Sequence, residues 1–90
     1  MTVSFIKAFH RDEIISDAKL CIKAAESVGT NLRIQDVVNA VFNTGGWERD
    51  SFELEKRQAI FEVIKEDILK ITANSTVSVS LLDDDEIEMR

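Results

Sequence analysis

The segment 50–73 places the strongest constraint on the fold, because it is the longest stretch of the chain with a clear hydrophobic period. Its apolar residues recur at spacings of three and four, which puts them on one face of an α-helix. Asp50 and Glu53 have the spacing of a capping box, in which each side chain accepts a hydrogen bond from a backbone N–H of the first turn. The sequence therefore predicts a helix over about 51–73, and its apolar face needs a partner. The stripe consists of Ile60, Phe61, Ile64, Ile68 and Ile71, with Leu54 and Val63 at its margins.

Two shorter helices are predicted before this segment, over about 12–28 and about 32–43, and both have apolar residues at helical spacing. Gly29 follows the last periodic residue of the first helix and predicts a stop there, because glycine adopts a left-handed conformation without a Cβ clash. Thr30 or Asn31 is the expected N-cap of the second helix. The chain has no proline and three glycines, so little interrupts long helices.

Short strands are predicted at both ends of this helical region, over about 3–8 and about 76–82. Val77, Val79 and Leu81 alternate with serines, which is typical of a half-buried strand. The first segment also fits a short helix, so an all-α fold is the alternative to a mostly helical α+β fold built on a three-helix bundle. A two-stranded sheet is marginal by itself. We therefore expect the terminal strands to extend the sheet of a partner or of a second copy in a homodimer.

Residues 1–82 are expected to form a single small globular domain, followed by an acidic tail over 83–90. The net charge of −6, from 17 acidic and 11 basic side chains, argues against nucleic acid as a partner. No apolar run approaches the ~18 residues of a membrane span, and the N-terminus lacks the pattern of a secretory signal. These features, with a single cysteine, predict a cytoplasmic protein that has no membrane partner.

Residues that could carry chemistry are few. His10 is the sole histidine, and Cys21 lies in the apolar stripe of the first helix, where a free cysteine usually serves as a small core residue. The acidic run 83–86 lacks the spacing of an EF-hand loop and indicates a solvated tail. No combination of nucleophile, base and oxyanion donors is present in the sequence. The prediction is a non-enzymatic protein without a metal ion or cofactor.

Two patterns point to other classes of function. The segment 50–54 resembles the Asp-Ser-Leu segment of acyl carrier proteins, although it has Phe52 where leucine is usual; the resemblance implies that Ser51 would carry phosphopantetheine. The two helices on either side of Gly29 superficially suggest a helix-turn-helix regulator. However, the polar face of the second helix contains one basic residue, Arg33, which is too little positive charge for phosphate contacts.

The leading hypothesis is a small acidic module that binds another protein with a basic surface and acts by contact alone. This class includes adaptors, chaperones, immunity or inhibitor proteins and phage-type antagonists. Trp47 lies in a glycine-flanked loop, and tryptophan is enriched at binding hot spots. The residues predicted to bind the partner are Trp47, Val77, Val79, Asp83, Asp84, Asp85 and Glu86.

Overall fold

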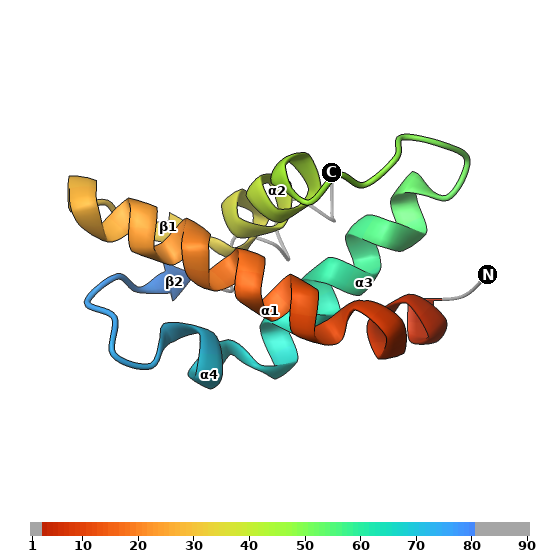
Figure 1. Cartoon of the computed structure of the whole chain (residues 1–90). Helices are drawn as coiled ribbons and strands as arrows, with labels where there is room; N and C mark the ends of the chain where they lie inside the picture. The colour runs from red at the N-terminus through yellow and green to blue at the C-terminus, as the bar shows by residue number, and fades with distance from the viewer. Residues whose placement is uncertain (1–2, 81–90) are drawn as a thin grey trace.

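One helix of 26 residues, α1 (Val3–Val28), runs along the molecule and contacts the other three helices (Figure 1). The computed structural model describes residues 3–80. After α1 come β1 (Leu32–Arg33), α2 (Ile34–Thr44), α3 (Glu53–Glu66), α4 (Ile68–Thr72) and β2 (Val79–Ser80). The fold is therefore mostly helical with a short two-stranded sheet, as the sequence predicts.

The predicted N-terminal strand over 3–8 is wrong, because these residues form the first turns of α1. The polar run after them does not break the helix. In the helical conformation Ile6 becomes buried, and Lys7 and Arg11 reach acidic residues of α3 and of the junction that follows it. Local alternation of apolar and polar residues cannot anticipate these contacts, since their partners are more than 50 residues away.

The predicted stop at Gly29 is confirmed. Gly29 has φ +71°, and the N–H groups of Gly29 and Thr30 donate to carbonyls of the last turn of α1. The predicted cap of the second helix is wrong, because α2 begins two residues later with Arg33 at the N-cap position. Asn31 serves the sheet instead, where its Oδ1 accepts from the N–H of Ser78 at 3.2 Å.

The single helix predicted over 51–73 is two helices, α3 and α4, separated at Asp67. Asp67 has φ −111° and ψ 26°, yet its N–H still donates to Val63 and its carbonyl accepts from Ile71. The carboxylate of Asp67 pairs with Arg11 of α1. This long-range ion pair accompanies the interruption, and the hydrophobic period alone does not contain it.

The capping box predicted at Asp50 and Glu53 is also wrong, because Phe52 occupies the N-cap position of α3. Asp50 Oδ1 accepts from the N–H of Phe52 at 2.9 Å, within the turn that precedes the helix. The side chain of Glu53 turns to two arginines instead of the backbone.

Of the strand predicted over 76–82, residues 79–80 form β2, residues 76–78 are not in a strand, and 81–82 lie outside the described part of the chain. This strand does not pair with the N-terminal segment 3–8, which is helical. It lies parallel to β1, with Leu32 opposite Val79 and Arg33 opposite Ser80. The hypothesis of a homodimer through two terminal strands therefore loses its N-terminal strand. Residues 81–90, including the predicted acidic tail, lie outside the described part of the chain.

The core consists of buried side chains from all four helices together with one residue before β2. In Figure 1, α1 lies against the other three helices, which contribute the side chains that pack on its buried face. None of the helices in the described part of the chain is long and apolar enough to cross a membrane. The core residues are Ile14, Ala18, Ile22, Ala25, Ile34, Val37, Val38, Val41, Phe42, Ile60, Val63, Ile64, Ile71 and Val77.

Candidate functional site

Four aromatic side chains form a continuous row on the surface where α1 meets the loop after α2. The rings of Phe5 and Phe9 lie 4.4 Å apart, the ring of His10 is 6.5 Å from that of Phe9, and Trp47 meets His10 edge-on at 4.8 Å. Phe9 is 69% exposed and Phe5 is 49% exposed. We refer to Phe5, Phe9, His10 and Trp47 as the aromatic surface. Helical spacing of four residues brings Phe5 and Phe9 together.

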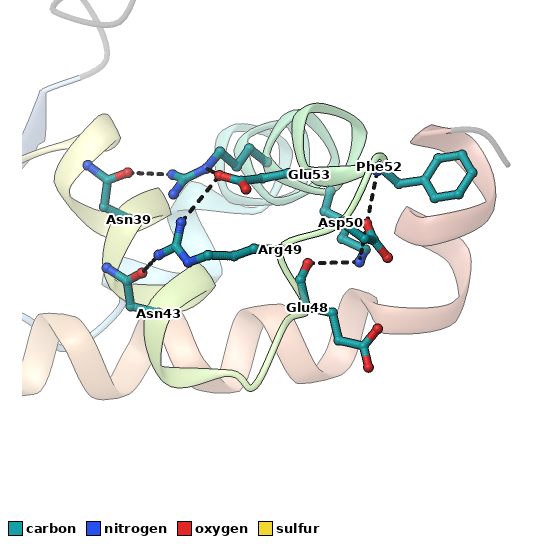
Figure 2. A network of polar contacts seen from close by, with 9 residues as sticks. Asn39, Asn43, Glu48, Arg49, Asp50, Phe52 and Glu53 are labelled. Carbon is teal, nitrogen blue, oxygen red and sulfur yellow. Dashed lines mark hydrogen bonds and ion pairs between the residues drawn. The ribbon is translucent and has the colours of Figure 1, made fainter.

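Arg49 fastens the loop that carries Trp47 to α2 and α3, and Arg57 of α3 links that helix to α2 (Figure 2). Arg49 donates to Asn43 Oδ1 at 2.6 Å and to Glu53 Oε2 at 3.3 Å. Arg57 donates to the same carboxylate oxygen at 3.1 Å and to Asn39 Oδ1 at 2.6 Å. Glu53 and Arg57 are four residues apart on α3, a spacing that favours such an ion pair.

Both guanidinium groups also lie over the ring of Phe42, a side chain that is 1% exposed. The Cζ atoms of Arg57 and Arg49 are 4.2 and 5.0 Å from the ring centroid. Such cation–π contacts add to the charge-assisted hydrogen bonds. The loop is therefore attached to the hydrophobic core through Phe42 as well as to the polar surface.

A second set of contacts fixes the turn just before α3. Lys56 Nζ donates to the carbonyl oxygen of Glu48 and to Asp50 Oδ1, each at 3.0 Å. The backbone N–H of Phe52, and then Lys56, hold the pKa of Asp50 below its ordinary value. In Figure 2 the ring of Phe52 points away from this polar network. The loop that carries Trp47 thus has defined contacts with α2 and α3.

Trp47 is half-buried and packs partly against the core, so it is both a cover for the core and a part of the surface. Its Nε1 is buried without a hydrogen-bond partner among the described residues. A Cβ atom at Gly45 would lie 2.7 Å from this nitrogen and 2.8 Å from the carbonyl oxygen of Val41. A side chain at position 45 would clash with the indole and with a backbone oxygen that cannot move aside easily. Gly45 is therefore required for the indole to occupy this position.

A hollow of about 310 Å³ borders the indole ring. Among its lining residues are His10, Glu13, Glu48 and Lys56. His10 Nδ1 lies 2.8 Å from Glu13 Oε1, so the carboxylate orients the imidazole. The hollow combines aromatic side chains with two acidic residues and one lysine, and the excess of negative charge favours a positively charged side chain of a partner.

The structure separates the residues that the sequence predicts to bind a partner. Trp47 belongs to the aromatic surface, whereas Val77 is buried in the core with 6% exposure and Val79 is half-buried in β2. Figure 1 shows β2 and the loop after α2 at opposite ends of the molecule. The four acidic residues Asp83, Asp84, Asp85 and Glu86 lie outside the described part of the chain.

Phe5 and Phe9 were missed by sequence reasoning, because their segment was assigned to a strand. The signal that could have found them is their i, i+4 spacing immediately before the sole histidine. Read as a helix, that spacing places two phenylalanines on one face, next to a polar turn.

Cys21 and His10 do not form a nucleophile pair, because eleven residues of one helix separate them by about 16 Å. Burial, and then the nearby charge of Asp36, raise the pKa of the Cys21 thiol, which keeps it protonated. Ser51 is exposed in the turn before α3. Within residues 3–80, no three side chains of the metal-ligating types gather closely enough to hold an ion.

Comparisons with protein-family models, with curated proteins and with solved structures find no match to this chain.

Proposed function

We propose that this protein is a binding module that acts by contact with another protein, and that the aromatic surface is its docking site. The observation that carries the proposal is the exposure of Phe9 and Phe5 side by side on a helix. Scattered apolar residues are normal on surfaces, but a contiguous aromatic row is a feature of protein interfaces. The arginine network beneath the loop supports this function, since a fixed surface loses little entropy on binding.

The charges around the aromatic surface favour a partner whose apolar groove is bordered by lysine or arginine. Asp12 lies three residues from Phe9 on the helix and is exposed, as are Glu13 and Glu48. The nearby basic residues are engaged already: Lys7 and Lys56 are in ion pairs and keep 18% and 15% of their side-chain surface exposed. The acidic rim therefore remains available to a basic partner.

The helix-turn-helix alternative gains no support from the contacts of α2. The amide oxygens of Asn39 and Asn43 accept hydrogen bonds from Arg57 and Arg49, and Asp36 pairs with Arg33. The polar face that would read DNA is thus used inside the molecule. The carrier alternative rests on Ser51 alone, and the mass of the protein after incubation with a phosphopantetheinyl transferase tests it.

The test of the proposal is partner capture followed by a binding measurement with the purified partner. Replacing Phe5 and Phe9 by alanine should weaken binding by more than about tenfold, as expected for aromatic anchors of an interface. The matched control is Leu69→Ala on α4, which removes a side chain that is 83% exposed and lies outside the aromatic surface.

Wild-type affinity in the double phenylalanine variant would contradict the assignment of the surface. Recovery of DNA without a protein partner would contradict the proposed class of function. Deletion of residues 83–90 tests the predicted acidic tail separately, since that tail and the aromatic surface can each contribute to capture.

A further inference from the structure

A second hollow, of about 330 Å³, lies between the second half of α1, α4 and the turn that follows α4. Ile22 and Ile71, which are 2% and 3% exposed, contribute to its lining from the core side. The other lining residues are polar or small, and three of them are lysines. They are Lys19, Lys23, Glu26, Lys70, Ala73, Asn74 and Ser75.

The three lysines are set apart from the other basic residues by what they contact. Within residues 3–80, six basic side chains form ion pairs with acidic ones, and Lys65 lies over the ring of Phe61. The remaining three basic residues of that part of the chain are Lys19, Lys23 and Lys70, and all three line the same hollow. In a protein with a net charge of −6, this is a local concentration of positive charge that has no ion-pair partner among residues 3–80.

The way the hollow is built accounts for this convergence. Lys19 and Lys23 are one helical turn apart on α1, and α4 brings Lys70 to them after the interruption at Asp67. Glu26 is the one acidic residue of the lining, and its Oε2 accepts from the N–H of Thr76 at 3.0 Å, which fastens the turn. Three lysines against one glutamate leave two more positive than negative charges.

The turn also offers hydrogen-bond donors. Ser75 Oγ accepts from the N–H of Val77 at 3.1 Å, so its hydroxyl hydrogen can point elsewhere. Asn74 has φ +67°, a left-handed conformation that asparagine tolerates, and it is one of the residues that line the hollow. Such groups complement lysine ammonium groups in binding oxyanions.

We propose that this hollow is a binding site for a small soluble ligand that carries a phosphate group. A phosphate presents several charged oxygens, which three ammonium groups and a hydroxyl can contact together. The volume lies at the lower end of the range for small-molecule sites, which suits a phosphate or diphosphate with a small attached group. The site is independent of the aromatic surface.

The test is a titration of the full chain with inorganic pyrophosphate at constant ionic strength, in which the NMR chemical shifts of the backbone amides are monitored. The expected result is saturable shifts over residues 19–26 and 70–75, with no comparable shifts around the aromatic surface. The variant Lys19→Gln/Lys70→Gln should weaken binding by at least about tenfold. Lys65→Gln is the control, because it removes one lysine of the same bundle without touching the hollow.

Shifts that do not saturate, that spread equally to Lys65, or that are unchanged in the double variant would overturn the proposal. All substituted side chains are exposed, so the variants should remain folded. The amide spectrum of each variant verifies this. A second arm measures sedimentation with phosphatidylcholine vesicles containing phosphatidic acid. Vesicle binding without pyrophosphate binding would assign the lysines to a lipid headgroup and overturn the assignment to a soluble ligand.

Discussion

In its second half (residues 14–28), α1 places Ile14, Ala18, Ile22 and Ala25 in the protein interior, whereas in its first half (residues 3–13) only Ile6 is buried. Ile6 is not among the residues of the main core cluster. The first half is joined to α3 by ion pairs instead: Lys7 Nζ lies 2.6 Å from Glu66 Oε2 and 3.0 Å from Glu62 Oε1.

This difference shows that the basic residues of α1 have different roles in the two halves of the helix. In the first half, Lys7 and Arg11 hold the helix through ion pairs, while Phe5 and Phe9 are 49% and 69% exposed. In the second half, apolar burial holds the helix, so Lys19 and Lys23 are not needed as attachments. The two proposed binding sites follow from this division.

The largest effect on stability is expected from truncating a buried side chain in the second half of α1. Ile22→Ala should lower the free energy of unfolding by about 2–5 kcal/mol, because it removes a buried side chain and leaves a cavity. Leu20→Ala, two residues away and 65% exposed, should change it by less than about 0.5 kcal/mol. Urea denaturation followed by circular dichroism measures both. Equal effects of the two variants would refute the claim that burial holds this half.

An intermediate effect is expected from acid, and it should appear in the first half. The hydrogen bond from Lys7, and then that from Arg11, lower the pKa of Glu66 below its ordinary value of 4.5, while Gln58 and then Lys7 lower that of Glu62. A lowered pKa in the folded state gives stability that is present above pH 4.5 and is lost as the pH falls through the folded-state value.

Protection of backbone amides from hydrogen exchange is the measurement. Below pH 4.5, the amides of residues 7–13 should lose protection before those of residues 18–25. The variant Glu66→Gln should show a smaller change with pH, because one of the two carboxylates no longer titrates. Simultaneous loss of protection in both halves would contradict the claim that ion pairs hold the first half and burial holds the second.

The smallest effect is expected from neutralising the basic side of the same contacts. Lys7→Gln should accelerate amide exchange in the first half by less than about tenfold, because Glu66 is exposed to solvent, which screens the ion pair and makes it weak. Exchange in the second half should not change. Lys65→Gln is the matched control, and a loss of global stability in Lys7→Gln would show that this ion pair does more than fasten one end of the helix.

The candidate sites were predicted only in part. Trp47 was identified because a tryptophan between glycines and charged residues stands out in a chain with few aromatics. Phe5 and Phe9 were not, since the first residues of the chain have a pattern that fits both a strand and a helix until their contacts are known. The convergence of Lys70 with Lys19 and Lys23 could not be predicted, because it depends on how α4 packs against α1.

By itself, the sequence determined the helical character of the molecule and the end of the first helix at Gly29. The spacing of apolar residues and the tolerance of glycine for a positive φ are both local properties of the chain. Only the tertiary structure decided that residues 3–8 are helical, that the chain is interrupted at Asp67, and that β2 pairs with β1. These outcomes depend on ion pairs, burial and strand pairing between segments far apart in the chain, and no local pattern contains the identity of such partners.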